Sequence, residues 1–170
     1  MSAFRLRPPH AGDLGWVIQR HGQLYAQEYD WNIEFEVLVA KVATEFFAGH
    51  DGLRERCWIA ERDGANGPEN IGSVFLMAHP TRPGVAKLRL LIVEPSARGL
   101  GVGKALVEAV THFAVTAGYH TITLWTNSVL VAARSIYEKA GYRIVDTEAH
   151  HSFGKDLISE TWELTLPPER

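Results

Sequence analysis

The residues with the clearest potential for chemistry lie between Arg98 and Lys104, where three glycines alternate with other residues. The glycines, Gly99, Gly101 and Gly103, stand between an apolar segment and a segment with helical periodicity. Glycines at such a junction allow a ligand to approach the backbone closely. The first N–H groups of a helix have no partner within the helix and carry the positive end of its dipole, so they bind anions such as phosphate. Arg98 and Lys104 add positive charge on either side, and the stretch predicts a phosphate-binding loop.

Three phosphate-binding patterns compete for this loop. A Walker P-loop requires glycine where Arg98 stands and Ser or Thr where Ala105 stands. A dinucleotide fingerprint requires glycine in place of Leu106 and an acidic residue in the next strand segment, which has none. The sequence from Arg98 to Gly103 does match Arg/Gln-x-x-Gly-x-Gly/Ala, the signature of coenzyme A binding.

Hydrophobic periodicity predicts the elements that position this loop. We expect helices over 13–25, 33–47, 101–117 and 132–140, and strands over 4–7, 57–61, 71–77, 85–93, 121–125, 142–148 and 162–166. Residues 63–70 are rich in turn-forming types and predict the turn of a hairpin. This order mixes hairpins with a β-α-β-α-β tail and predicts an α+β (mixed α/β) fold around a mixed sheet. Because no repeat or linker interrupts the chain, we expect a single domain over 1–170.

Composition and charge narrow the class of protein. Hydrophobic residues make up 46% and charged residues 22% of the 170 positions, as in ordinary globular proteins. The 17 Lys and Arg against 20 Asp and Glu give no positive field that would attract nucleic acid. No apolar run reaches the ~18 residues of a membrane span and no signal core is evident, so a cytoplasmic protein without a membrane partner is expected. Cys57 is the single cysteine, which excludes an intrachain disulfide, and we expect no metal site.

Four segments together resemble a known family. In chain order they are Leu91–Pro95, Arg98–Gly103, Trp125–Asn127 and Ala132–Tyr142. Their order and spacing resemble the GCN5-related N-acetyltransferases (GNAT) over essentially the whole chain. Two further segments, Arg54–Arg62 and His150–Gly154, make the chain most similar to the GNAT domains fused to MarR-type regulators in bacteria. The resemblance implies a mostly antiparallel sheet of six to seven strands, splayed in the middle and flanked by about four helices.

The resemblance also implies acetyl-CoA as the cofactor. Backbone N–H groups of the loop would hold its pyrophosphate, and its pantetheine arm would lie between the splayed strands. Tyr137 would protonate the departing thiolate, at modest cost because a phenol has a reference pKa near 10 and a thiol near 8.5. The cofactor-binding residues implied are Leu91, Ile92, Val93, Arg98, Gly99, Leu100, Gly101, Val102, Gly103, Lys104, Asn127, Ala133 and Tyr137.

The acceptor side departs from the family pattern. Many members place a carboxylate, acting as general base, where this chain has Lys87, and Arg89 follows on the same side of the strand. Two cations cannot take a proton from an ammonium group. Either the base lies elsewhere, or the amine arrives neutral, or a chain of water molecules carries the proton. If this side of the strand lines the cleft, the cations suit an acid group on the acceptor; on an outward edge they would be ordinary surface charges.

The first two helix segments are expected to bound the acceptor pocket. Glu28 is the first candidate for the base, catalytic together with Tyr137, and His21 is the second, although either could be a solvated helix residue. A loop over 150–154, between the last two strands, is expected to overhang the site. The expected substrate-binding residues are His21, Tyr25, Tyr29, Lys87, Arg89 and His151.

These expectations describe an acetyl-CoA-dependent N-acetyltransferase. It would transfer an acetyl group to a primary amine of a small molecule, such as an amino acid or another acid-bearing amine, by direct attack in a ternary complex. Cys57 is expected to be buried rather than nucleophilic. The alternative function for the same loop is a non-catalytic acyl-CoA-binding sensor or regulatory module. By analogy with relatives that pair through their late strands, a homodimer is expected.

Overall fold

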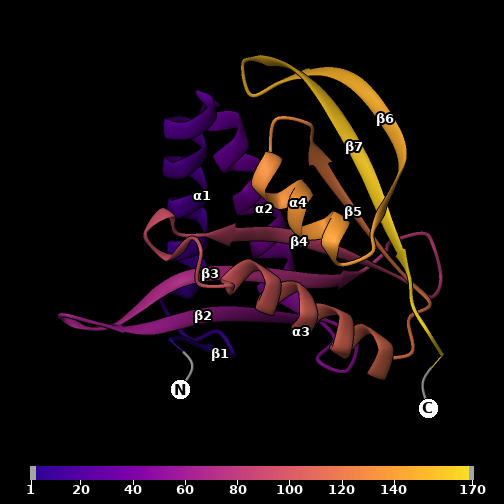
Figure 1. The fold of residues 1–170 in the computed structure, drawn as a ribbon, viewed down its shortest axis with the longest axis horizontal. Helices are drawn as coiled ribbons and strands as arrows, with labels where there is room; N and C mark the ends of the chain where they lie inside the picture. The colour runs from indigo at the N-terminus through magenta and orange to yellow at the C-terminus, as the bar shows by residue number, and fades with distance from the viewer. Residues whose placement is uncertain (1–2, 169–170) are drawn as a thin grey trace.

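The computed structural model describes residues 3–168, which form helices and strands around one sheet (Figure 1). The helices are α1 (Asp13–Tyr29), α2 (Ile33–Gly49), α3 (Val102–Thr116) and α4 (Val131–Lys139), with a short 3-10 turn, η1 (Pro95–Ala97). The strands are β1 (Arg5–Arg7), β2 (Arg56–Gly64), β3 (Gly67–Ala78), β4 (Val85–Val93), β5 (Thr121–Asn127), β6 (Arg143–Ser152) and β7 (Lys155–Thr165). Among these residues, no helix is both long and apolar enough to cross a bilayer.

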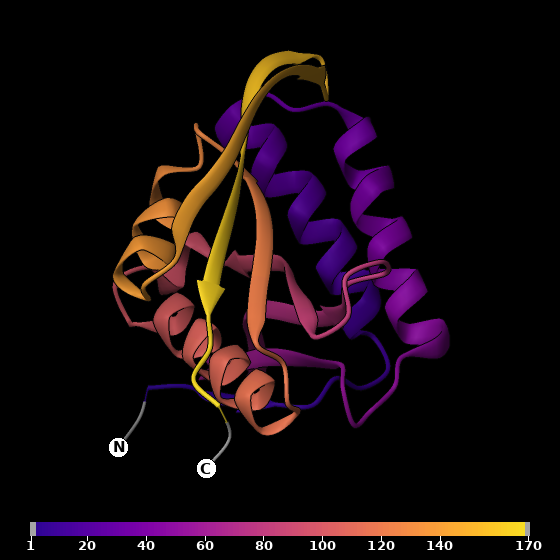
Figure 2. The ribbon, with the colours of Figure 1, turned by 90° about the vertical axis from the view of Figure 1, so that its right-hand side faces the viewer.

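The strands form one sheet in the order β1-β2-β3-β4-β5-β7-β6. Every neighbouring pair is antiparallel except β4 and β5, which run parallel. Helices α1 and α2 cover one face of the sheet, and α3 and α4 lie on the other (Figure 2). The expected α+β fold with a mixed, mostly antiparallel sheet and four helices is therefore confirmed for the described residues.

The core has two layers because the central strands are covered on both faces. In β2, Ile59 packs with α1 and α2, whereas the adjacent Ala60 packs under α3. In β3, Phe75 and Leu76 divide between the same two layers. Successive side chains of a strand point to opposite faces, so a strand buried on both sides is mostly apolar. This accounts for the apolar run Val74–Met77 in β3, and the buried Ser73 donates its hydroxyl to the Leu90 carbonyl oxygen.

The parallel strands β4 and β5 pair over only a short stretch before they separate. The register joins Val85–Lys87 to Thr121–Thr123 and ends there. Three residues further along β4, a β-bulge places one extra residue opposite β3, and Leu90 adopts a left-handed backbone with φ 55°. A bulge bends its strand and re-aims the side chains around it. The sheet is therefore open between the second half of β4 and the second half of β5.

The β6–β7 hairpin folds over the ends of α1 and α2. At its turn, the Phe153 ring lies 4.9 Å from Trp31 and 5.1 Å from Phe35, measured between ring centroids. The Asn32 N–H donates a hydrogen bond of 3.1 Å to the Phe153 carbonyl oxygen, and the Lys155 ammonium lies 2.8 Å from an Asp30 carboxylate oxygen. Aromatic packing thus fixes a hairpin whose outer strand, β6, is largely exposed.

The hairpins extend further than the sequence predicts. Residues 150–152 belong to β6 rather than to a loop, and β7 begins at Lys155 instead of at position 162. In the same way, β2 and β3 remain paired as far as Gly64 and Gly67, so most of the turn expected over 63–70 is strand. Antiparallel pairing satisfies the backbone of polar residues as well as of apolar ones, and hydrophobic pattern alone does not detect such extensions.

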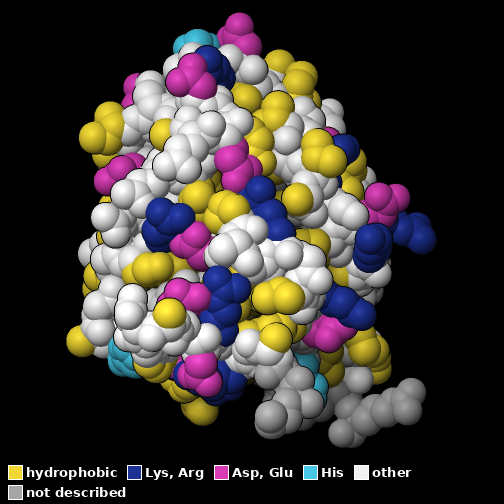
Figure 3. Space-filling model, turned by 60° about the vertical axis from the view of Figure 1, so that its left-hand side comes forward, with side chains coloured by type: hydrophobic (Ala, Val, Ile, Leu, Met, Phe, Trp, Pro, Cys, Tyr) yellow, Lys and Arg dark blue, Asp and Glu magenta, His cyan; other side chains and the backbone are white. Residues whose placement is uncertain are grey.

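Charges are mixed over the surface. On the face drawn in Figure 3, Lys and Arg side chains are interspersed with Asp and Glu side chains and with hydrophobic groups. Charges in the structure are also paired across elements, such as Arg20 with Glu94 at 2.5 Å and Arg82 with Glu163 at 2.6 Å. This face presents no extended field of one sign.

The close approach of α3 to the sheet predicts a penalty for a side chain at Gly72. A Cβ there would lie 2.9 Å from the Ile92 carbonyl oxygen and 3.1 Å from a Val102 methyl carbon. Because a backbone oxygen cannot move aside freely, we expect Gly72→Ala to lower the free energy of unfolding by about 1–3 kcal/mol. Gly15, in α1, has open space around it, so Gly15→Ala is expected to raise that free energy by about 0.5–1 kcal/mol. Urea unfolding measures the free energy of unfolding of both variants. Equal changes in the two variants would contradict the prediction.

Candidate active site

Two adjoining cavities lie where β4 and β5 separate. The first, called the α2 cavity below, has a volume of about 500 Å³ and lies among α1, α2, β4 and β5. The second, called the loop cleft, has a volume of about 530 Å³ and lies among the end of α1, the end of β4, the loop before α3, and α4. The two share wall residues, among them Tyr25, Leu91 and Ala133. A molecule can therefore extend from one cavity into the other through the opening in the sheet.

The loop cleft contains the backbone arrangement that binds phosphate. Gly99 and Gly101 have left-handed φ angles of 84° and 82°, and Gly101 is the N-cap of α3. The first turn of that helix starts at the cleft wall, where its free N–H groups carry the positive end of the dipole. Gly103 has a different role, since a Cβ there would lie 2.6 Å from the end of the Ile136 side chain. Its lack of a side chain lets α3 pack closely against α4.

Most of the residues expected to bind cofactor line this cleft. They are Leu91, Ile92, Val93, Arg98, Gly99, Gly101, Val102, Gly103, Lys104 and Ala133. Asn127 and Tyr137 line the α2 cavity instead. Leu100, between the two left-handed glycines, lines neither cavity and its side chain is 44% exposed. Because the contact expected of Leu100 is made by its backbone N–H, the exposed side chain does not decide it, and the contact stays a prediction.

Glu28 lies in the loop cleft rather than in the α2 cavity. Its carboxylate forms an ion pair with the Arg98 guanidinium at the mouth of the cleft. Tyr29 also lines the loop cleft, and partial burial together with the nearby Glu28 charge raises the pKa of the Tyr29 hydroxyl. Glu28, the first candidate for the base, and Tyr137, the expected proton donor, thus line different cavities.

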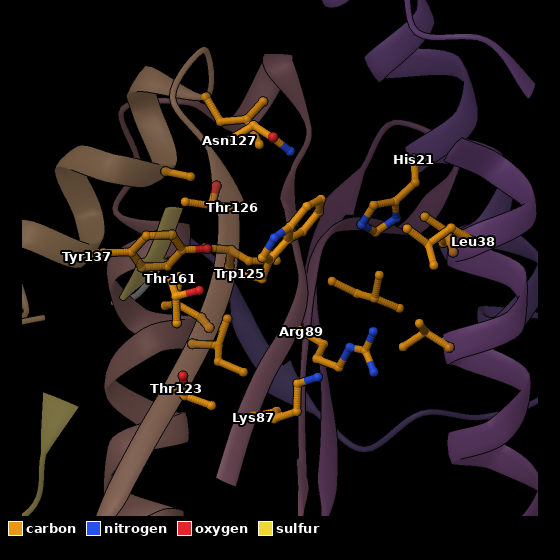
Figure 4. A pocket seen from close by; sticks show the side chains of 18 of the residues that line it. His21, Leu38, Lys87, Arg89, Thr123, Trp125, Thr126, Asn127, Tyr137 and Thr161 are labelled. Atoms are coloured by element: carbon orange, nitrogen blue, oxygen red, sulfur yellow. The ribbon is translucent and has the colours of Figure 1, made fainter. Parts of the chain in front are cut away.

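Lys87 and Arg89 point together into the α2 cavity (Figure 4). Among residues 3–168, neither side chain has an acidic partner within ion-pair distance. Burial lowers the pKa of the Lys87 ammonium, and the neighbouring Arg89 lowers it further. Burial also lowers the pKa of Arg89, and the charge of Glu45 partly offsets this. The alternative that these two cations are ordinary surface charges on an outward edge of the sheet is thus excluded. They form a positively charged patch within a cavity.

Tyr137 lies on α4 and is 5% exposed. Its hydroxyl points into the α2 cavity, toward the side where Trp125 lies (Figure 4). Burial raises the pKa of Tyr137, and the nearby Tyr25 and Tyr142 raise it further. The phenol is consequently neutral over the physiological range and carries a proton that it can donate.

Asn127 ends β5 and has its side-chain amide oriented by His150. Its Oδ1 lies 2.8 Å from His150 Nε2, and His150 Nδ1 lies 2.9 Å from the Ser152 hydroxyl. With the amide oxygen accepting from His150, the amide N–H groups of Asn127 are left for the cavity that Asn127 lines. The sequence analysis did not predict this role for His150. His150 lines neither cavity and contacts the site only through Asn127.

His21 is buried in α1, with its ring directed into the α2 cavity (Figure 4). Its Nδ1 lies 2.7 Å from the Val17 carbonyl oxygen, one turn earlier in the helix. Burial lowers the pKa of His21 to about 4, so the ring is neutral near pH 7. Tyr25 stacks on it at 5.9 Å between ring centroids.

His151 does not reach either cavity. It lies on the exposed β6 strand, where its Nδ1 is 2.8 Å from an Asp156 carboxylate oxygen. The substrate contact expected for His151 depends on a loop over the site, and the structure has strand there. Phe153 is the residue of this region that packs inward, against Trp31.

Several residues of the α2 cavity were not anticipated. Trp125, Thr123 and Thr161 line it from β5 and β7, and His79 and Arg82 lie at the end near Lys87. Trp125 belongs to the segment Trp125–Asn127, which resembles the GNAT family. Its place on the strand across from Lys87 and Arg89 could have indicated from the sequence that it lines the same cavity. Thr161 reaches the cavity wall because β7 pairs with β5, which places Thr161 opposite Trp125. The residues around Thr161 in the sequence do not indicate this position.

Comparison with known proteins identifies the family. The model for the acetyltransferase (GNAT) family matches residues 20–142. The chain therefore belongs to the GNAT family of acetyltransferases. Human N-acetylaspartate synthetase is 36% identical over 94 residues, which are 55% of this chain and 30% of that protein. A mycothiol acetyltransferase of Paenarthrobacter aurescens is 31% identical over 83 residues, 47% of this chain and 26% of that protein. The chain thus spans less than a third of the length of these curated relatives.

Solved structures share the fold. An acetyltransferase structure from Salmonella typhimurium with its cofactor acetyl-CoA has a TM-score of 0.76 at 17% identity, covering 98% of this chain and 95% of that one. A GCN5-related N-acetyltransferase from Kribbella flavida has a TM-score of 0.72 at 22% identity, covering 96% of this chain and 98% of that one. Acetyl-CoA is the cofactor of the family. The loop cleft fits it, since left-handed glycines and a helix N-terminus form a cradle for phosphate beside an apolar channel between two strands.

The glycine at the start of α3 leads to a prediction about cofactor affinity. Gly101 and Gly12 are both helix N-caps with left-handed φ, and both have open space around them, but Gly12 lies outside the two cavities. Left-handed backbone strains any residue with a Cβ by about 1–2 kcal/mol. We expect Gly101→Ala to weaken acetyl-CoA binding about tenfold because the loop relaxes and moves its N–H groups. Gly12→Ala should lower the free energy of unfolding by a similar amount without weakening acetyl-CoA binding. Calorimetric titration of both variants checks this, and equal affinities would contradict it.

Proposed function

We propose that the chain transfers the acetyl group of acetyl-CoA to the primary amine of a small molecule that also carries a carboxylate, with aspartate as the first acceptor to test. The observation that carries this proposal is the pair of cations, Lys87 and Arg89, inside the α2 cavity. Guanidinium and ammonium groups that are partly removed from water bind a carboxylate strongly, through charge-assisted hydrogen bonds. An acid-bearing acceptor would supply the negative charge that this part of the cavity lacks.

The names of the relatives support an acid-bearing acceptor. Several of them are N-acetylaspartate synthetases, including those of human and rat. Aspartate joins one amine to two carboxylates, which suits a cavity with two cations on one wall. The mycothiol acetyltransferases among the relatives show that acceptors differ across this group, so the cations of this chain carry more weight than the names do.

The roles of the residues follow from their positions. Acetyl-CoA supplies an acetyl group activated as a thioester. The N–H groups at the start of α3 would hold its phosphates, and Lys87 and Arg89 would orient the acceptor so that its nitrogen meets the acetyl carbon directly. Once the ammonium group of the acceptor has lost a proton to solvent, its neutral nitrogen would form the new C–N bond as the C–S bond breaks. Tyr137 Oη would give its proton to the departing sulfur atom, and the proton then lost by the nitrogen would pass through water to restore the Tyr137 hydroxyl. Burial raises the pKa of Tyr137, but burial beside it would also raise the pKa of the departing thiol, so the proton transfer stays modest in cost.

Cys57 has no part in this proposal. It is buried in β2 within the layer under α1 and α2, and it lines neither cavity. Burial raises the pKa of the Cys57 thiol, which keeps it protonated. A direct transfer between two bound molecules therefore remains the proposed reaction, without a covalent intermediate on Cys57.

The remaining sequence-based expectations stay predictions. They are a single domain over 1–170, a cytoplasmic and bacterial protein, a homodimer, no nucleic-acid or membrane partner, and closeness to the GNAT domains fused to MarR-type regulators. The last rests on the segments Arg54–Arg62 and His150–Gly154.

Tyr137 and its neighbour Tyr142 provide a matched test of the proton donor. We expect Tyr137→Phe to lower kcat about 10²- to 10⁴-fold, the range for loss of a general acid, with acetyl-CoA affinity little changed. Tyr142 is also buried, its hydroxyl has no partner in the described part of the chain, and it lines neither cavity. Tyr142→Phe should therefore keep kcat. Release of free thiol under saturating substrate measures both, and equal kcat values would contradict the role of Tyr137.

The acceptor proposal is tested by a panel of amines. The panel includes aspartate, its side-chain amide asparagine, and simple alkylamines, each measured by acetyl-CoA-dependent thiol release. We expect Arg89→Gln and Lys87→Gln each to raise KM for aspartate about 10- to 100-fold, the effect of losing a hydrogen bond to a charged group. Arg56→Gln is the control, because Arg56 lines neither cavity. If acetyl-CoA binds but no amine in the panel is acetylated, the acid-bearing-acceptor proposal fails and the alternative of a non-catalytic acyl-CoA sensor gains support.

A further inference from the structure

His21 carries a buried polar atom without a partner. The side chain is 1% exposed, and Nε2 has no hydrogen-bond partner among the described residues. Leaving a buried polar group unpaired is unfavourable, so native proteins rarely do so without a reason. The ring lies on the wall of the α2 cavity, and Figure 4 shows it directed into that cavity. The unpaired atom thus belongs to a place where a ligand can supply the missing partner.

The hydrogen bond at the other ring nitrogen determines what kind of partner is needed. A carbonyl oxygen can only accept, so the 2.7 Å contact with Val17 requires the hydrogen to be on Nδ1. A neutral imidazole has one N–H, and the ring is neutral because burial lowers the pKa of His21 to about 4. Nε2 therefore presents a lone pair, and its partner must be a donor. Tyr25 and Phe35, the aromatic neighbours of the ring, make it a rigid acceptor.

The α2 cavity consequently has two chemically different walls. Lys87 and Arg89 on β4 offer only donors and positive charge, which suits carboxylate oxygens. His21 on α1 offers an acceptor, which suits an N–H group. An α-amino acid carries both kinds of group on one carbon atom. A carboxylate could not use Nε2, because two lone pairs would face each other.

We infer that His21 is the subsite for the amino group of the acceptor, which donates an N–H hydrogen bond to Nε2. This inference rests on the proposed function and deepens it, since it names the residue that recognises the amine in the same cavity. The hydrogen bond transfers no proton. It selects amine-bearing acids over acids of the same shape that lack the amine, and it sets the orientation in which the nitrogen lies.

The test compares aspartate with succinate, the same dicarboxylate without the amine. Both are titrated calorimetrically into the protein in the presence of coenzyme A. We expect His21→Leu, which fills much of the same space with an apolar side chain and removes Nε2, to weaken aspartate binding about 10- to 100-fold, as for a hydrogen bond to a charged donor. Succinate affinity should stay within about twofold. His21→Gln, whose side-chain oxygen can again accept, should recover part of the aspartate affinity.

A spectroscopic measurement on the unaltered protein keeps the inference testable if the variants fold poorly. In protein labelled with ¹⁵N at histidine, the Nε2 signal of His21 should be that of an unprotonated nitrogen. It should shift when aspartate is added and stay in place when succinate is added. An aspartate-to-succinate affinity ratio that His21→Leu leaves unchanged, or an Nε2 signal that responds equally to both acids, would overturn the role of His21 alone. Failure of both acids to bind the unaltered protein would overturn the proposed acceptor class, and this inference with it.

Discussion

The short parallel pairing of β4 and β5 is the constraint on which the rest of the structure depends. The two strands share only the register Val85–Lys87 with Thr121–Thr123, and each then continues beside its other neighbour. Backbone groups that face a gap in a sheet need partners from elsewhere. In this chain the gap opens onto the loop cleft on one side and onto the α2 cavity on the other. A cofactor arm and an acceptor can therefore meet inside the sheet, which a fully paired sheet would not allow.

Charged groups lie at the ends of the two cavities, and neutral groups lie between them. Positive groups lie at the far ends, with the α3 N-terminus and Arg98, itself paired with Glu28, in the loop cleft and Lys87 with Arg89 in the α2 cavity. The groups between them are neutral: the Tyr137 phenol, the Asn127 amide and the His21 imidazole. Anionic parts of two bound molecules would be held apart at the ends, leaving their uncharged reactive atoms together in the middle. Because the Tyr137, Asn127 and His21 side chains are at most 5% exposed, their hydrogen-bonding groups act more strongly than they would in water.

Strained backbone accompanies this arrangement. Leu90 at the bulge and Phe153 at the hairpin turn both have left-handed backbone without being glycine. Such conformations cost about 1–2 kcal/mol each, and they persist where surrounding contacts offset them. For Phe153 the offset is the aromatic packing against Trp31 and Phe35. For Leu90 it is the pairing of β3 with β4 on both sides of the bulge. Each strained residue thus lies where a strand or hairpin turns toward the cavities.

Local sequence determined the features that depend on neighbouring residues only. Left-handed Gly99 and Gly101, the helix that follows them, and the common side of Lys87 and Arg89 all follow from backbone geometry within a few residues. Tertiary structure alone decided the features that depend on distant segments. It paired Glu28 with Arg98 and left His151 outside the site, in contact with Asp156. It also placed His21, whose Nε2 has no hydrogen-bond partner among the described residues, on a cavity wall. These outcomes depend on where α1, β4 and the β6–β7 hairpin meet. That meeting is set by long-range packing and strand register, which no local pattern encodes.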